Sequence, residues 1–234
     1  MAEQITLPQP SPRPTSERYE MPSDAVNIAV DGIHFFESDR GKVKREEKIG
    51  KTFGEYHVKA TSLTQYGIEA DRSKISEKEQ AVGISKGIVR ELQDDGVDFN
   101  ALTPNEQAAA IMYLYNAGSK QKKFRNALSK LAKARKSNSN DIDRYREMAA
   151  GFIDVYLADG KYNPGLATRR LVEQQLFLNN KTNYKEMRSK FNELSDSELR
   201  KKVRNARNNS DSFLRNQNSK KLLEPEFLPG TTYP

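Results

Sequence analysis

One segment constrains the fold of this chain more than any other: residues 104–118, which read PNEQAAAIMYLYNAG. As a helix it would be apolar on almost every side, and such a helix is normally buried among other elements. Thr103 and Glu106 have the spacing of a capping box, and Pro104 stands at the first helical position, where its missing N–H costs nothing. The segment therefore predicts a central helix that ends at Gly118 inside an all-helical lobe.

Helical periodicity recurs on both sides of this segment. Apolar spacing predicts a first helix over 26–37, with Ser23 as its N-cap, on which Val30, Ile33 and Glu37 share one stripe. A capping-box spacing at residues 76 and 79 begins another helix with an apolar face. Further helices are predicted over 124–136, 141–159 and 166–178.

Residues 52–68 are the exception, because they lack helical period and contain strand-forming residues. We interpret them as a small antiparallel sheet. A small sheet followed by a mostly helical lobe makes the predicted fold α+β, and mostly α.

The two ends of the chain differ from the middle. Residues 1–25 are rich in proline among small polar residues, so we expect an extended arm. Residues 26–180 form the predicted domain. Residues 181–234 carry two short amphipathic patterns, the second begun by a capping box at Ser195 and Glu198, and we expect two helices outside the main core, followed by an extended end.

Composition excludes several classes of protein. The chain has no cysteine, which excludes disulfides and thiol nucleophiles. Its only histidines are His34 and His57, too few for a zinc site with three histidine or cysteine ligands. We therefore expect no metal and no cofactor. No apolar run approaches the ~20 residues that a membrane span needs. The N-terminus lacks the layout of a secretory signal.

The positive charge is concentrated in the tail. The whole chain has a net charge of +7, and residues 181–234 hold twelve Lys and Arg against seven Asp and Glu, a net charge of +5. An acidic partner is therefore expected for this part. The cluster lacks interleaved aromatic residues for base stacking, so we favour docking to a protein over nucleic acid. Its members are Arg200, Lys201, Lys202, Arg204 and Arg207.

Residues 83–87, GISKG, match the G-x-S-x-G pattern of serine hydrolases. That motif requires a strand before it and a sharp turn at the serine. Here it lies within a predicted helix, so we interpret the match as chance.

Glu37 is the candidate for acid catalysis. Glycoside hydrolysis needs a carboxylic acid that protonates the leaving oxygen, and an apolar setting favours the protonated form of such a group. Glu37 continues the apolar stripe of the first helix, and Phe35 and Phe36 precede it directly.

The segment 33–40, IHFFESDR, is similar to the I-x-x-F-E-G-x-R motif of the phage-type lysozymes, glycoside hydrolase family twenty-four, with Ser38 in place of the glycine. In that family the glutamate is the catalytic acid at the end of the first helix. The resemblance implies a lysozyme-like fold and muramidase activity, with Glu37 as general acid.

The second part of the family's site is an Asp followed six residues later by a Thr, which together activate water. Glu55 and Thr61 reproduce this step with Glu in place of Asp. Aligning Tyr66-Gly67 with the family's next motif favours His57 or Thr64 instead. Both alternatives stay open at the level of sequence.

The rest of the resemblance covers residues 75–178. Tyr115, Asn116 and Gly118 match the family's motif beside the substrate cleft. Arg169 and Arg170, in the segment GLATRRLVEQQLF, match an arginine pair of which one member lies against the catalytic acid. The resemblance implies that these residues contact substrate or support the site.

These observations predict a bacteriophage muramidase that hydrolyses the β-1,4 bond between N-acetylmuramic acid and N-acetylglucosamine in peptidoglycan. The resemblance also implies inversion at the anomeric carbon. Carriage in a virion, with residues 1–25 and 181–234 bound to other virion proteins, would bring it to the host periplasm and cell wall; a holin-type pore is another route. The alternatives are an inactive lysozyme-like structural virion protein, a lytic transglycosylase that needs only Glu37, and a DNA-associated capsid protein.

Overall fold

The computed structural model describes residues 23–38, 56–118, 120–137, 142–153, 157–158, 161–179 and 183–208. This part of the chain is mostly helical, as predicted, with almost no strand. Its helices, in chain order, are α1 (Ser23–Ser38), α2 (Ala60–Tyr66), α3 (Glu77–Asp94), the short 3-10 helix η2 (Phe99–Ala101), α4 (Pro104–Ala117), α5 (Lys122–Lys136), α6 (Ile142–Gly151), α7 (Pro164–Asn179), α8 (Tyr184–Asn192) and α9 (Asp196–Asn208).

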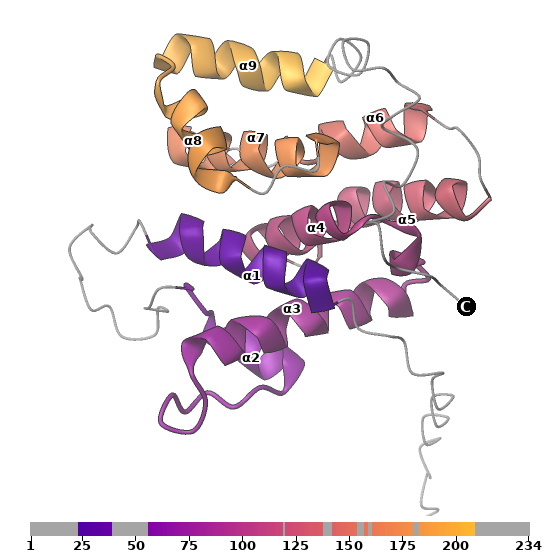
Figure 1. Ribbon diagram of the computed structural model, residues 1–234, viewed down its shortest axis with the longest axis vertical. Coiled ribbons are helices and arrows are strands. Elements are labelled where there is room, and N and C mark those ends of the chain that lie inside the picture. The colour runs from indigo at the N-terminus through magenta and orange to yellow at the C-terminus, as the bar shows by residue number, and fades with distance from the viewer. Residues whose placement is uncertain are drawn as a thin grey trace, which may run out of the picture.

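Helix α4 is the central element, which confirms the prediction from its composition. Every residue from Glu106 to Tyr115 is buried. Its N-terminus has the predicted capping box: the hydroxyl of Thr103 accepts the backbone N–H of Glu106, and the Glu106 carboxylate accepts the backbone N–H of Thr103. Helices α1, α3 and α7 pack against it, and Figure 1 shows α4 in the middle of the stack.

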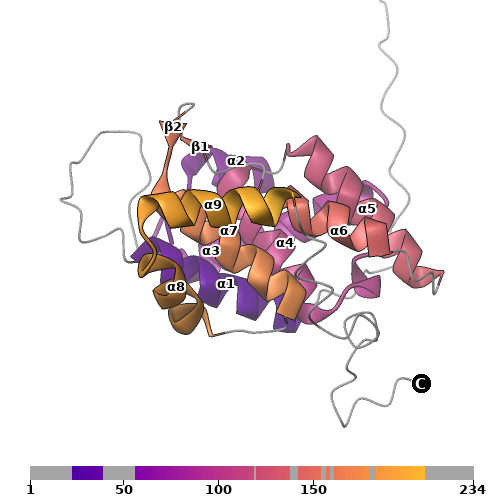
Figure 2. The ribbon, with the colours of Figure 1, turned by 90° about the horizontal axis from the view of Figure 1, so that it is seen from above.

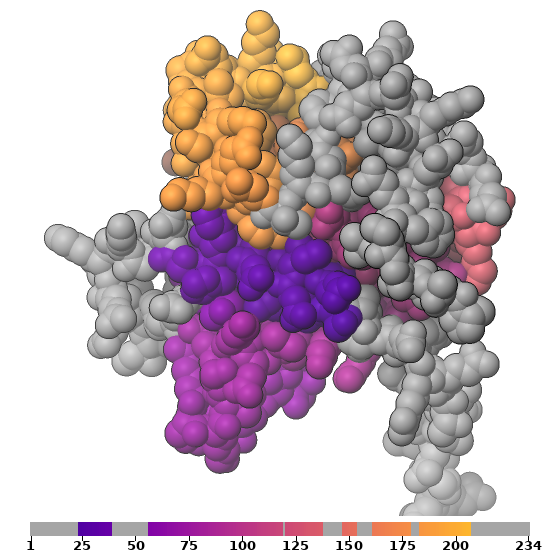
Figure 3. Space-filling model, viewed as in Figure 1, coloured from indigo at the N-terminus to yellow at the C-terminus, as the bar shows by residue number. Residues whose placement is uncertain are grey.

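Helix α1 lies across one face of the molecule, between α2 and α3 on one side and α8 and α9 on the other (Figure 3). Its predicted stripe is confirmed, since Val30, Ile33 and Glu37 are all buried. Gly32 lies where the side chains of Met112 and Tyr184 come closest to the helix, and a Cβ there would overlap Met112. This face of α1 therefore packs directly on both α4 and α8.

The sheet predicted over 52–68 is wrong for residues 56–68, which contain α2 instead; residues 52–55 lie outside the described part of the chain. Helix α2 ends at Gly67, which has a left-handed φ of 63°. The Gly67 N–H bonds Thr64 O at 3.3 Å and the Ile68 N–H bonds Leu63 O at 2.9 Å, the pattern of a Schellman motif. The Gly67-Ile68 pair was the helix-end signal that the strand interpretation overlooked.

The helix predicted over 141–159 is also wrong in its length. Helix α6 ends at Gly151, and Phe152 and Ile153 follow it as buried turn residues. Strands β1 (Leu157–Ala158) and β2 (Lys161–Tyr162) then pair antiparallel (Figure 2). The two residues between these strands read Asp-Gly, which is a typical hairpin-turn pair.

The G-x-S-x-G match lies inside α3, as predicted, and its residues are explained by packing. Ser85 is buried and its hydroxyl donates to the Ala81 carbonyl at 2.9 Å. The side chains of Ile68 and Tyr66 rest on Gly83 and Gly87, respectively. The two glycines therefore give α2 and its following turn a close approach to α3.

The predicted helices beyond residue 183 are present as α8 and α9, but α8 is not outside the main core. Tyr184 and Met187 belong to the same buried cluster as α1 and α4, and the Tyr184 hydroxyl donates to the Ile28 carbonyl at 2.7 Å. Helix α9 packs on α6 and α7, where Leu199 and Val203 join a smaller core cluster. Figure 2 shows α9 lying over α7.

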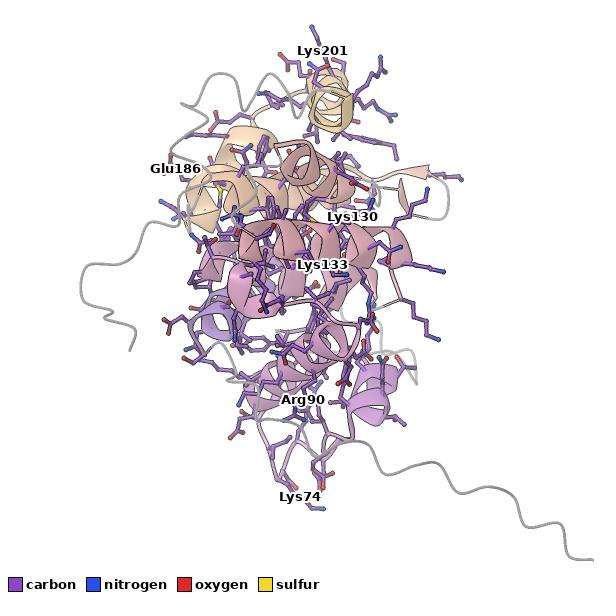
Figure 4. All side chains as sticks on the ribbon, turned by 90° about the vertical axis from the view of Figure 1, so that its right-hand side faces the viewer. Lys74, Arg90, Lys130, Lys133, Glu186 and Lys201 are labelled. Atoms are coloured by element: carbon purple, nitrogen blue, oxygen red, sulfur yellow. The ribbon has the colours of Figure 1, made fainter. Side chains whose placement is uncertain are left out.

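Many of the basic side chains that the structure describes point into solvent (Figure 4). Lys130 and Lys136 of α5 pair with Glu147 at 2.9 Å and Asp98 at 3.0 Å. Arg200 of the predicted basic cluster stacks on the ring of Tyr162, 3.7 Å from its centroid. Lys201, Lys202 and Arg204 are exposed, and the side chain of Arg207 lies outside the described residues. None of the described helices is long and apolar enough to cross a membrane.

Candidate functional site

The candidate site is built around Glu37, at the C-terminal end of α1. Its residue surface is only 2% exposed. The burial follows from the sequence, because Glu37 continues the face of α1 that Val30 and Ile33 turn toward the core. A carboxylate in such a position must be matched by charged or polar partners.

Helix α7 provides those partners. The Arg169 guanidinium donates through Nη1 to Glu37 Oε1 and through Nε to Glu173 Oε1, the latter at 2.9 Å. Arg170 donates through Nη1 to Glu173 Oε2 and through Nη2 to Asn116 Oδ1 on α4. A chain of contacts therefore runs from α1 through α7 to α4. Of the arginine pair singled out in the sequence, Arg169 is the member that lies against Glu37.

The four charged groups of this network are all buried and balance one another in formal charge. Burial disfavours the charged form of Arg169, but the adjacent carboxylates of Glu173 and Glu37 outweigh it and raise the pKa of the guanidinium. Burial and the neighbouring Arg169 lower the pKa of Arg170, against the opposing effect of Glu173. Removing any one member would leave a buried charge without its partner, which is costly.

Aromatic rings pack against the guanidinium groups of the two arginines. The guanidinium carbon of Arg169 lies 5.3 Å from the centroid of the Phe36 ring. That of Arg170 lies 4.6 Å from the centroid of the Tyr113 ring. Both distances are within the range of cation–π attraction, so the rings stabilise the cations that hold Glu37 and Glu173.

His57 faces the other oxygen of Glu37. Its Nδ1 lies 3.5 Å from Glu37 Oε2, and its side chain is 36% exposed whereas that of Glu37 is 3% exposed. His57 also has a positive φ of 47°, and it is the one non-glycine residue with this property among the residues described. Such strain in a non-glycine residue clusters at functional sites.

The backbone before His57 is fixed by two other helices. The Tyr115 hydroxyl of α4 donates to the Tyr56 carbonyl at 3.0 Å, and the Tyr56 N–H donates to Glu77 Oε1 of α3 at 3.2 Å. The Tyr56 ring packs on His34 of α1, with centroids 4.8 Å apart. Burial, followed by the charge of Glu37, raises the pKa of Tyr115, so its hydroxyl remains a donor.

The other candidates from the sequence lie as follows. Thr61 is exposed on α2, and none of the Glu37 contacts given above involves it. Thr64 is also exposed and donates to the Ala60 carbonyl of its own helix at 3.2 Å. Glu55 lies outside the described residues. Gly118 ends α4 with a φ of 92° and donates its N–H to the Leu114 carbonyl at 2.9 Å.

One member of the network was missed by the sequence analysis. Glu173 follows Arg169 by four residues and Arg170 by three, so all three side chains lie on one side of α7. The apolar residues on both sides of this pattern were the available signal, because a charged triplet in an apolar helix has to be paired within the core.

No protein-family model matches the chain, and no curated protein or solved structure is significantly similar to it. Functional inference therefore depends on the residues of this site and on the motifs that surround it.

Proposed function

We propose that this protein is a glycoside hydrolase of the lysozyme type, and that Glu37 supplies the proton in cleavage of the β-1,4 bond between N-acetylmuramic acid and N-acetylglucosamine. The observation that carries the proposal is a carboxyl at the end of the first helix, held by Arg169 on one oxygen and faced by His57 on the other. An arginine beside the catalytic acid is what the lysozyme-like motifs imply.

Three features of the site support a functional role for Glu37. The Glu37 side chain is fixed in place by a fully buried cation rather than by a mobile surface group. The group that faces its other oxygen is the imidazole of His57, with Nδ1 3.5 Å from Glu37 Oε2. Of the residues matched to the family's cleft motif, Asn116 accepts from Arg170 and Tyr115 donates to the carbonyl of Tyr56, the residue before His57.

The resemblance also gives the proposal its biological setting. Peptidoglycan of a bacterial host wall is the proposed substrate, and carriage in a bacteriophage particle is the proposed route to it. Residues 1–25 and 181–234 are the proposed attachment segments to other virion proteins. Within the second segment, α8 and α9 pack on α7, so the attachment surface there is their exposed basic side.

A second candidate is an inactive lysozyme-like structural protein of the virion. The observation that favours it is that both oxygens of Glu37 already face protein groups, Arg169 and His57, while the side chain is 3% exposed. A buried ion pair of this kind also serves as an ordinary core element, with no catalytic role.

Digestion of purified peptidoglycan separates these candidates. Wild type, Glu37→Gln and a matched control, Glu193→Gln on the exposed turn after α8, are compared with products identified by mass spectrometry. Reducing muramic ends released by wild type and the control, but not by Glu37→Gln, support the muramidase. Anhydromuramic ends identify a lytic transglycosylase. No release by any of the three folded proteins supports the structural alternative.

A further inference from the structure

Helix α5 presents an exposed row of lysines that the proposed function does not use. The helix holds seven Lys and Arg residues and no Asp or Glu. Its exposed residues are Asn126 and five lysines, which we call the lysine face: Lys122, Lys123, Lys130, Lys133 and Lys136. At ~100° per residue, these side chains lie within ~140° of the helix circumference. The charge is therefore gathered on one side of α5, where it faces solvent.

Part of this charge is not paired within the fold. The two arginines of α5 pair with carboxylates on α4 and at the C-terminal end of α3, and two of the lysines pair with Glu147 and Asp98. In the part of the chain that the structure describes, no carboxylate forms an ion pair with Lys122, Lys123 or Lys133. Two of these three lysines stand in the first turn of α5, where the helix dipole disfavours positive charge. The three cations are therefore available to an anion outside the fold.

The composition of the lysine face indicates which kind of partner it fits. Protein–protein interfaces are depleted in lysine and depend on aromatic and arginine anchors, and the exposed residues of α5 include neither. Proteins that bind single-stranded nucleic acid use aromatic side chains on which the bases stack. A duplex keeps its bases stacked inside and presents its phosphates outward, and lysines alone bind these phosphates by displacing counterions.

We propose that the lysine face of α5 binds the phosphate backbone of duplex DNA without sequence preference. The face extends from Lys122 to Lys136, which is ~21 Å at ~1.5 Å per residue. One strand of B-DNA presents about six phosphates over that length. Figure 4 shows Lys130 and Lys133 of this face. The proposal is independent of the glycosidase function, because no residue of the lysine face belongs to the candidate site.

A salt titration of DNA binding tests the proposal. The full-length protein is added to a short fluorescent duplex of arbitrary sequence, and anisotropy is measured at several salt concentrations. The triple variant Lys122→Gln/Lys123→Gln/Lys133→Gln removes three charges without breaking a described ion pair, and glutamine keeps the helix propensity of lysine. We expect the slope of log K against log salt concentration to become shallower by ~2–3, at ~0.9 per phosphate contact, and affinity at low salt to fall at least ~10-fold.

The matched control removes the same number of charges from α9, through Lys201→Gln/Lys202→Gln/Arg204→Gln. Its slope and affinity should stay close to those of wild type, and circular dichroism checks that both variants are folded. Equal losses in the two triple variants would overturn the proposal, because overall charge and not α5 would then account for binding. Tighter binding of an oligo-dT single strand than of the duplex would also overturn it. A folded wild type that does not bind the duplex would leave the lysine face as a solvated surface and refute the proposal.

Discussion

The ring of Tyr66, the last residue of α2, lies against the backbone of Gly87 in α3, so closely that a Cβ at residue 87 would overlap the ring carbons. Tyr66 is only partly buried, yet this contact and the adjacent one between Ile68 and Gly83 attach α2 to the rest of the fold. The segment that carries Val58 and His57 begins directly before α2. The position of His57 beside Glu37 therefore depends in part on a glycine in a distant helix.

Gly87→Ala should lower the free energy of unfolding by ~1–3 kcal/mol, because the added methyl must displace the Tyr66 ring from a close-packed contact. Urea denaturation measures the change. Gly165→Ala is the matched control, since its new Cβ would meet only Asn163 Oδ1 at 3.4 Å on the exposed first turn of α7. Equal stability of the two variants would show that the contact with Tyr66 carries no packing energy.

Local signals in the sequence predicted most helices and their beginnings. The capping boxes at residues 76, 103 and 195 are all present, because the groups that form them lie within three residues of one another. The burial of α4 was predicted because its composition leaves no polar face. In these elements the local preference and the tertiary structure agree.

The incorrect predictions concern segments whose structure depends on contacts between residues that are far apart in the sequence. Residues 60–66 have few apolar side chains, and their helix is stabilised by the Schellman turn at Gly67 and by the contact of Tyr66 with Gly87. Of the candidate site, Glu37 was predicted from its place on an apolar stripe. Its contact with Arg169, which is 132 residues away, was accessible only through a family resemblance. Glu173 lies in the matched segment GLATRRLVEQQLF but was overlooked, because its role becomes visible only in its contacts with Arg169 and Arg170.

Substitution of Glu173 is expected to destabilise the fold more than substitution of any other member of the buried network. Glu173→Gln keeps the shape of the side chain but removes the charge that both Arg169 and Arg170 contact, so the loss should reach ~3–5 kcal/mol. Glu147→Gln is the matched control, since Glu147 is about half exposed in its pair with Lys130 and should contribute at most ~1 kcal/mol. Chemical denaturation at neutral pH compares the two. A loss in Glu173→Gln no larger than in the control would show that the network is not energetically coupled.

The capping box of α3 should be visible in a carboxyl titration. Hydrogen bonds from the Ser76 hydroxyl and backbone N–H hold the pKa of Glu79 below its ordinary value of 4.5. Because the folded-state pKa is lowered, the stabilisation is present above pH 4.5 and is lost as the pH falls through the folded-state pKa. NMR titration of the side-chain carboxyl should show this, and Ser76→Ala should move the pKa of Glu79 back toward 4.5. An unchanged titration in Ser76→Ala would contradict the assignment.

The buried pair of Arg135 and Glu106 should make stability depend on pH in the opposite direction to the Glu79 capping box. Glu106 is buried, which raises its pKa, while Arg135 and the hydrogen bonds from Thr103 act against this increase. Arg135→Met removes the cation and leaves the carboxyl buried, so its pKa should rise further and the group should be protonated in the folded state over a wider pH range.

A raised folded-state pKa stabilises the protein below the ordinary value of 4.5, and this stabilisation is lost as the pH rises through the folded-state pKa. The stability deficit of Arg135→Met relative to wild type should therefore be small at about pH 5 and reach ~3–5 kcal/mol at about pH 8. Urea denaturation at the two pH values measures it. The double variant Arg135→Met/Glu106→Gln cannot charge at residue 106, so its own free energy of unfolding should lack this dependence on pH. A pH-independent deficit in Arg135→Met alone would mean that Glu106 obtains its stabilisation from Thr103 and not from the arginine.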